Sequence, residues 1–396
     1  MMKTTEDFYC NQKFWYLTVD VEKLSMSSCC EATLERINID HIKNNPGQIF
    51  NSPTLLDERR DMLSNIPVKS CTKACWSPES NGKTSRRISM EGYTRTHLDV
   101  ESSVSTLNLV LGSDCNLGCV YCCKFYSSFW RNDLLTNGPY GIESGNERFK
   151  LTTEDRIVSK LSQKEIKLSS NRKVILKELE HVCGTKGIQR IMITGGEPFL
   201  YNDLITLLGE LHTTAEIEIW TGLGVDPKRL ERQIDMMSHL DISLVISAEN
   251  VGDHYEFIRN GNNWARLERA VEMFRSKKIK YRFACTLTNM SIFGFSEFLG
   301  RFPEESKSLN LCVDPDFMSI GVMDERSKDM VLEQHRNSPV EIKKLIESNI
   351  VIEPTLTQRS DIGKFLEEFS SRRGLDLGIF PEHFLDWTRM TTDVVQ

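Results

Sequence analysis

Residues 105–122 read STLNLVLGSDCNLGCVYC, an apolar run followed at once by three cysteines. The run at 105–111 predicts a short buried strand, and Cys115, Cys119 and Cys122 follow it in the spacing CxxxCxxC. Thiolates are the usual ligands of iron–sulfur clusters, which normally take four. Three closely spaced cysteines therefore leave one iron open. The competing interpretation is a structural zinc loop with its fourth ligand elsewhere, although such loops usually show CxxC pairs.

Downstream of this stretch, short apolar runs alternate with amphipathic segments. Strands are predicted at 105–111, 187–194, 216–220, 241–247, 280–287 and 308–313, and helices at 152–182, 202–212, 227–239, 262–278 and 291–301. Strands alternating with helices at this spacing imply βα units and a parallel sheet. Six strands are too few for a closed eight-stranded barrel. We therefore expect an α/β fold with an open, partial (βα)6 TIM-like barrel and chemistry at the C-terminal strand ends.

Three regions are predicted along the chain. Residues 1–100 form an N-terminal cysteine-bearing module and linker, residues 101–315 the barrel, and residues 316–396 a mainly helical C-terminal extension. The first region is expected to contain an aromatic strand at 14–21, a helix at 54–64 and, because 77–96 is polar, a linker or extended arm.

A second motif, Thr194-Gly195-Gly196-Glu197-Pro198, ends the second predicted strand. Glycine lets the backbone approach a ligand closely, and the carbonyl groups and Glu197 can accept hydrogen bonds from an ammonium group. Taken alone, the motif is an ordinary strand-to-helix turn. Its position one βα unit after CxxxCxxC favours a ligand site over a zinc loop.

Through CNLGCVYC, TGGEP and the strand order, residues 105–315 resemble the radical S-adenosylmethionine superfamily. The resemblance implies that Cys115, Cys119 and Cys122 bind a [4Fe–4S] cluster whose open iron takes S-adenosylmethionine. It implies an enzyme that reductively cleaves this cofactor to a 5′-deoxyadenosyl radical, which removes hydrogen from a substrate. A flavodoxin- or ferredoxin-type electron donor is the implied partner.

The same resemblance assigns the residues around S-adenosylmethionine. Tyr121 would lie beside the adenine, and Gly195, Gly196 and Glu197 would hold the methionine amine. Ser247, in Ser-Ala-Glu-Asn after the fourth strand, would contact the ribose or a carboxylate, although a strand-end cap explains it equally well.

Four cysteines upstream of the barrel, Cys10, Cys29, Cys71 and Cys75, form a second candidate site, and Cys30 could replace Cys29. This region loosely resembles an auxiliary-cluster module of the SPASM or twitch type, which implies a second [4Fe–4S] cluster with no open iron. Cysteine spacing limits which residues can bind a metal together but does not identify the metal. A zinc site with the same ligands and buried free thiols therefore remain alternatives.

Composition limits the other classes of function. The chain has 49 Lys and Arg against 56 Asp and Glu, and a net charge of −7 argues against a generally basic nucleic-acid coat. The apolar runs are too short to span a bilayer, and the start MMKTTEDFYC lacks the pattern of a secretory signal. We expect a cytoplasmic protein, in the host cytoplasm if it is virus-encoded, with no membrane partner.

No motif in residues 301–396 indicates the substrate. Auxiliary-cluster relatives often modify peptides, so the resemblance implies a peptide or amino-acid moiety. One alternative is an isomerase or modifying enzyme that acts on an amino-acid-decorated nucleobase in DNA, and a small molecule is also open. A second alternative is a non-catalytic iron–sulfur or zinc protein with a degenerate site.

Overall fold

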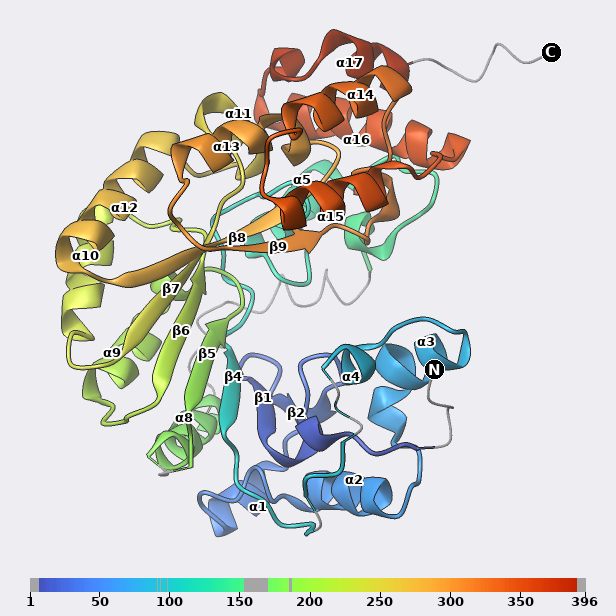
Figure 1. The fold of residues 1–396 in the computed structure, drawn as a ribbon. Helices are drawn as coiled ribbons and strands as arrows, with labels where there is room; N and C mark the ends of the chain where they lie inside the picture. The colour runs from blue at the N-terminus through green and yellow to red at the C-terminus, as the bar shows by residue number, and fades with distance from the viewer. Residues whose placement is uncertain are drawn as a thin grey trace. The chain divides into compact units, whose positions relative to one another are not determined.

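The computed structural model describes residues 7–90, 92, 94–97, 99–152, 170–184 and 187–389. The chain divides into two compact units, each described by itself. Figure 1 labels the helices and strands. The first contains Met1–Gly112, Leu161–Ile219 and Ile234–Ser243, and the second contains Ser113–Lys160, Trp220–Gln233 and Leu244–Gln396. The division passes through three elements, β6 (Glu216–Thr221), α10 (Pro227–Met236) and β7 (Ile242–Ser247).

In its described residues, the first unit contains six sheet strands in the order β3-β2-β1-β4-β5-β6. β1 pairs antiparallel with β2 and parallel with β4, with Tyr16 opposite Thr106 and Asp20 opposite Val110. β4 and β5 are parallel, as are β5 and β6. The N-terminal strand therefore extends the sheet in which the predicted barrel strands begin. The remaining strand bounds are β1 (Tyr16–Asp20), β2 (Ser25–Ser27), β3 (Glu35–Arg36), β4 (Thr106–Val110) and β5 (Arg190–Thr194).

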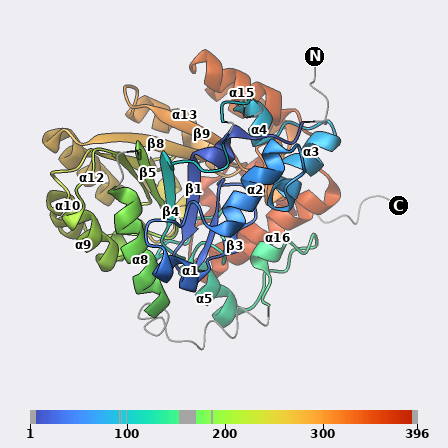
Figure 2. The same cartoon turned by 90° about the horizontal axis from the view of Figure 1, so that it is seen from below.

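Helices of the first unit pack around this sheet (Figures 1 and 2). The carboxylate of Glu178 in α8 accepts hydrogen bonds from the backbone N–H groups of Gly47 (2.6 Å) and Ile49 (2.8 Å), which follow α1. This contact fixes the end of α1 against α8. The helices are η1 (Asn11–Phe14), α1 (Ile39–Asn44), α2 (Pro53–Leu63), η2 (Lys69–Cys71), the π-helical turn η3 (Thr72–Trp76), α3 (Ser77–Ser80), α4 (Arg86–Ser89), α8 (Ser170–Cys183), η5 (Pro198–Leu200) and α9 (Asn202–Glu210).

In the second unit the strand order is β7-β8-β9, and β8 and β9 are parallel. Helices precede and follow these strands, and those after β9 account for most of residues 316–389. The remaining elements are α5 (Ser128–Asn137), η4 (Glu147–Phe149), α11 (Gly252–Ile258), α12 (Trp264–Lys277), β8 (Lys280–Leu287), η6 (Ser291–Gly294), α13 (Phe295–Arg301), β9 (Lys307–Leu311), η7 (Asp316–Met318), α14 (Glu325–Gln334), α15 (Val340–Ile350), α16 (Leu356–Arg373), η8 (Leu377–Ile379) and α17 (Glu382–Arg389).

An aromatic cluster joins residues 124–150 to the C-terminal helices of the second unit. The fully buried Trp130 of α5 lies 5.6 Å from Tyr140 and 5.9 Å from Phe369 of α16, measured between ring centroids. Phe380 lies 5.0 Å from Phe257 of α11, edge to face. Such ring pairs add to the free energy of apolar burial. The residues just before α17 therefore pack against α11 in this unit.

The α/β class, the succession of six βα units and the helical C-terminal region are confirmed. Part of the helix predicted at 152–182 corresponds to α8, and 153–169 lie outside the described residues. The division into 1–100, 101–315 and 316–396 stays a prediction. In the described part of the chain, no helix is both long and apolar enough to cross a bilayer.

The linker or extended arm predicted at 77–96 is wrong for residues 77–89. Helices α3 and α4 occupy this stretch, and Glu79 and Arg87 form a buried ion pair between them. The hydroxyl of Ser85 donates to Glu79 and also accepts from the N–H of Ile88 at the start of α4. These polar side chains satisfy one another's charges and hydrogen bonds, so they can be buried although their sequence is typical of a solvated linker.

Candidate active site

The cysteine loop at 115–122 is irregular backbone that two helices hold in place within the second unit. The Ser128 hydroxyl, at the first residue of α5, accepts from the Cys115 N–H (3.0 Å) and donates to the Cys115 carbonyl (3.1 Å). The Trp130 indole N–H donates to the Cys119 carbonyl (2.9 Å). On the side of α11, the N–H of Val120 donates to the Ile258 carbonyl (3.0 Å). The loop is therefore fixed along its length.

Gly118 is required between the first two cysteines. A Cβ atom at this position would lie 2.5 Å from the Phe129 ring, closer than packed atoms approach. The glycine lets α5 lie against the loop, so its role is to pack protein against protein.

The three thiols differ in exposure but lie within electrostatic reach of one another. Cys119 is buried, whereas Cys115 and Cys122 are half-buried. Burial raises the pKa of Cys119. Burial also raises the pKa of Cys122, and the neighbouring thiols of Cys119, Cys123 and Cys115 raise it further. Three thiolates in this loop need a compensating cation, which a metal centre supplies.

This donor set suits an iron–sulfur cubane. Among the residues that the structure describes, no three His, Cys, Asp or Glu side chains are placed to hold one metal ion. A cubane takes one thiolate at each protein-bound iron, so its ligands surround the cluster instead of converging on a single ion. Three thiols from one short, anchored loop match that requirement.

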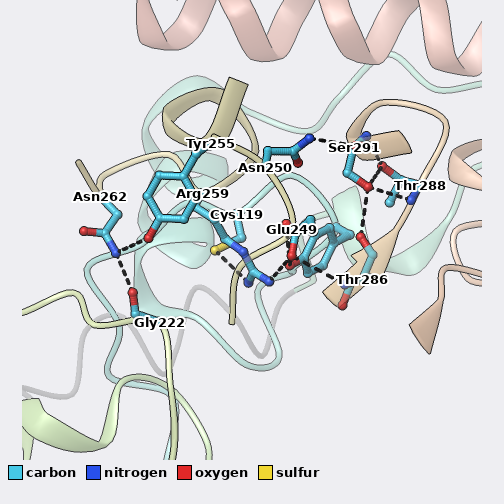
Figure 3. A network of polar contacts seen from close by, with 11 residues as sticks. Cys119, Gly222, Glu249, Asn250, Tyr255, Arg259, Asn262, Thr286, Thr288 and Ser291 are labelled. Atoms are coloured by element: carbon cyan, nitrogen blue, oxygen red, sulfur yellow. Dashed lines mark hydrogen bonds and ion pairs between the residues drawn. The ribbon is translucent and has the colours of Figure 1, made fainter. Parts of the chain in front are cut away.

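A buried charge network adjoins the loop (Figure 3). Arg259 caps the C-terminus of α11, and its guanidinium donates to the Glu249 carboxylate (2.7 Å) and to the Cys119 sulfur (3.7 Å). The Tyr121 hydroxyl also donates to Glu249 (3.3 Å), and the Arg259 guanidinium lies over the Tyr121 ring, 4.8 Å from its centroid. The backbone N–H of Thr286 in β8 donates to Glu249 (3.4 Å).

Burial of this network affects the pKa of its carboxyl group. Burial raises the pKa of the Glu249 carboxyl, although the Arg259 guanidinium opposes the shift. The Glu249 side chain is fully inaccessible and that of Arg259 is 6% exposed. One negative and one positive charge therefore compensate each other out of contact with water.

Polar side chains continue the network after β7 and β8. The Asn250 amide donates to the Ser291 carbonyl (2.7 Å), and the Asn289 amide donates to the Phe317 and Val322 carbonyls (both 2.9 Å). Among the described residues, the side-chain carbonyl oxygens of Asn250 and Asn289 are buried without a hydrogen-bond partner. Unsatisfied buried acceptors are costly, and they cluster where proteins bind ligands or store strain.

The Gly-Gly-Glu-Pro turn belongs to the first unit. Gly195 has φ +89°, and a Cβ on it would lie 2.8 Å from the Gly112 carbonyl oxygen. Glu197 is fully buried, and its carboxylate accepts from the Phe199 N–H (3.3 Å) at the start of η5. Gly195 is thus needed for packing against the end of β4, a requirement that the motif itself does not reveal.

The other predicted cofactor residues lie in the second unit. Tyr121 belongs to the Arg259 network, and Ser247 is the half-buried last residue of β7. The sequence prediction missed Glu249 and Arg259. Glu249 lies two positions after Ser247 in the same Ser-Ala-Glu-Asn stretch, which is a usable signal, whereas nothing in the pattern distinguishes Arg259.

The N-terminal cysteines occupy one region of the first unit. Cys10 and Cys71 share an apolar cluster with Met62 and Val68. Burial raises the pKa of Cys10 to about 12, and the thiols of Cys29, Cys71 and Cys75 also influence it.

Cys29 and Cys30 differ in environment. Cys29 is buried and donates to the Gln12 amide oxygen (3.5 Å), whereas Cys30 is exposed. A hydrogen bond from the Cys30 thiol lowers the pKa of Cys29, and the Glu31 N–H and the buried Lys13 ammonium act in the same direction. These contacts favour Cys29 over Cys30 as a ligand.

Comparison with known proteins identifies a known domain in this chain. Residues 109–297 match the family model of the Radical SAM superfamily. A search of curated proteins found no match. Residues 109–297 therefore carry a domain of the Radical SAM superfamily. Such a domain implies a [4Fe–4S] cluster that binds S-adenosylmethionine.

Similar solved structures include three of anSMEcpe. Native anSMEcpe with bound AdoMet is 16% identical at a TM-score of 0.38, with 62% of this chain and 62% of that chain covered. Hexahistidine-tagged anSMEcpe with bound AdoMet is 15% identical at 0.37, covering 59% and 57%. Native anSMEcpe with bound AdoMet and the Cp18Cys peptide is 15% identical at 0.36, covering 58% and 57%. The chain thus spans less than two thirds of these proteins.

Proposed function

We propose that Cys115, Cys119 and Cys122 hold the [4Fe–4S] cluster and that this chain modifies a peptide or an amino-acid moiety by hydrogen-atom abstraction. The observation that carries the cluster assignment is the anchored three-thiol loop with the Arg259 N–H on Cys119. When bound, the cluster supplies the electron that cleaves S-adenosylmethionine to the 5′-deoxyadenosyl radical. An electron donor of the flavodoxin or ferredoxin type would provide that electron.

The protein's own residues would orient the groups and exclude water. Helices α5 and α11 fix the loop backbone, so the three sulfurs keep their positions when the charge of the cluster changes. Tyr121, Gly195, Gly196, Glu197 and Ser247 remain the predicted contacts to S-adenosylmethionine. The buried Glu249–Arg259 pair keeps charged groups beside the loop without a water shell.

A second cluster on Cys10, Cys29, Cys71 and Cys75 is the finer part of this proposal. Support comes from the buried thiols and from Lys13, which is 1% exposed and donates to Glu58 (2.7 Å) and Ser70 (3.1 Å) beside them. A buried ammonium compensates part of the negative charge of a thiolate-ligated cluster. Zinc on the same thiols is the alternative, and iron counting decides between them: about eight irons per chain means two cubanes and about four means one.

Anaerobic reconstitution followed by a 5′-deoxyadenosine assay tests the catalytic assignment. The reduced protein is expected to convert S-adenosylmethionine to 5′-deoxyadenosine, and Cys119→Ala is expected to abolish that product. Cys285→Ala is the matched control, because Cys285 is buried in β8 and lies outside the CxxxCxxC loop. Equal product from Cys119→Ala and the parent protein would contradict the assignment.

Substrate class is tested separately with deuterated candidates. A peptide pool deuterated at its α and β carbons is expected to transfer deuterium into 5′-deoxyadenosine. Transfer from a nucleoside carrying an amino-acid group, and not from the peptides, would replace the peptide proposal by the nucleobase alternative.

A further inference from the structure

Arg259 is a buried cation that divides its hydrogen bonds between a sulfur and a carboxylate. Its Nη1 donates to the Cys119 sulfur (3.7 Å) and its Nη2 to Glu249 (2.7 Å), as Figure 3 shows. An arginine that only neutralises a carboxylate commonly presents both arms to it in a bidentate pair. Here one arm is directed at a thiol of the CxxxCxxC loop, which indicates a role beyond charge compensation.

Both the backbone and the side chain of Arg259 are held by hydrogen bonds. Its backbone N–H donates to the Tyr255 carbonyl (2.8 Å) at the end of α11, where a cation is favoured by the helix dipole. Glu249 is held in turn by the Tyr121 hydroxyl and the Thr286 N–H. The guanidinium therefore has little freedom to leave Cys119.

We propose that Arg259 is a positioning residue that raises the reduction potential of the cluster held by Cys119. An N–H donated to a ligand sulfur, together with a nearby positive charge, stabilises the more negative, reduced state. Glu249 offsets part of the charge and fixes the direction of the N–H. This inference rests on the proposed cluster assignment to Cys115, Cys119 and Cys122.

The test is a redox titration of the reconstituted protein, followed by electron paramagnetic resonance. The signal that changes when S-adenosylmethionine is added identifies the relevant cluster. In Arg259→Gln we expect the ratio of reduced to oxidised cluster at fixed potential to fall at least tenfold, which is about 59 mV for one electron. Arg259→Lys keeps the charge but loses the planar fork, so its potential should lie between those of the parent and Arg259→Gln.

Arg372→Gln is the matched control. Arg372 is a buried arginine of the same unit that pairs with Asp133 (3.2 Å) and with Glu368 in α16. Its substitution is expected to leave the potential unchanged. If Arg259→Gln retains full iron and its potential equals that of the parent, the proposal is overturned. Should Arg259→Gln fail to retain iron, Arg259→Lys decides, and an unchanged potential there overturns the proposal equally.

Iron content separates this inference from the cluster assignment. If Cys119→Ala binds as much iron as the parent and gives the same resonance signal, the assignment to Cys119 fails. If Cys119→Ala loses iron while all Arg259 variants keep the parent potential, the assignment stands and only the role of Arg259 is refuted.

Discussion

Removing the Glu249 carboxylate should cost the cluster-free protein about 3–5 kcal/mol of unfolding free energy, because it strands a buried guanidinium. In Glu249→Ala, Arg259 loses its partner at 2.7 Å while its side chain stays 6% exposed. The change also removes the acceptor of the Tyr121 hydroxyl and of the Thr286 N–H. Water cannot replace these contacts unless the site opens.

A double-mutant cycle separates the cost of the stranded Arg259 charge from a simple loss of packing. Arg259→Met in the Glu249→Ala background removes the stranded cation, so the double variant should be more stable than the sum of the single changes predicts. A coupling of about 1–3 kcal/mol is expected for residues in direct contact. Urea denaturation of the reduced, metal-free protein, followed by circular dichroism, measures each free energy.

Glu333→Ala is the control for this cycle. Glu333, near the end of α14, pairs with Arg336 at 3.0 Å, but the two side chains are 67% and 64% exposed. Exposed pairs contribute less than about 1 kcal/mol, so this variant should remain close to the parent. A cost for Glu249→Ala no larger than that of the control, or additive free energies in the cycle, would show that the buried pair is not coupled.

Three further predictions concern other parts of the chain. Gly195→Ala should destabilise the first unit by at least about 1–2 kcal/mol, because its φ of +89° is left-handed and the new Cβ meets the Gly112 carbonyl, and an unchanged melting temperature would contradict this. Asp361→Ala should speed limited proteolysis at 138–150 severalfold, since the carboxylate of Asp361 accepts from the N–H groups of Glu143 (2.6 Å) and Ser144 (3.1 Å). Burial lowers the pKa of His335 in the folded protein below its usual 6.5. The neutral, buried imidazole therefore contributes fully to the free energy of unfolding above pH 6.5, and this contribution is lost as the pH falls through the pKa of the folded state. His335→Gln should therefore flatten the acid side of the stability curve, and equal slopes in variant and parent would refute the assignment.

The core strands were predictable because each is a short apolar run between helical segments. The run at 280–287 coincides with β8 (Lys280–Leu287), and 187–194 contains β5 (Arg190–Thr194). A buried parallel strand leaves this signature whatever its neighbours are. By contrast, the pairing of β1 with β4 joins segments about 90 positions apart, and no local pattern encodes such a pairing.

The missed site residues share a different cause. Arg259 ends α11, and a basic residue at a helix C-terminus is typical of a solvated end. It is buried because Glu249 and Tyr121 approach it from other segments, so its environment exists only in the folded chain. The Cys loop was predictable for the opposite reason, since its chemistry lies within eight consecutive residues.

Because β1 pairs with β4, this part of the sheet cannot form until β4 has been synthesised. Tyr16 gains its partner Thr106 only after the ribosome has delivered about 90 further residues, which takes roughly 5–20 s at 5–20 residues per second. Until then β1 has the short β2 as its neighbour, and a small hairpin is marginally stable in water. Cys10 is synthesised just before Tyr16, and Cys29, Cys71 and Cys75 follow within this interval, before β4 can pair with β1. These thiols of the nascent chain therefore stay accessible for seconds, until β4 pairs with β1.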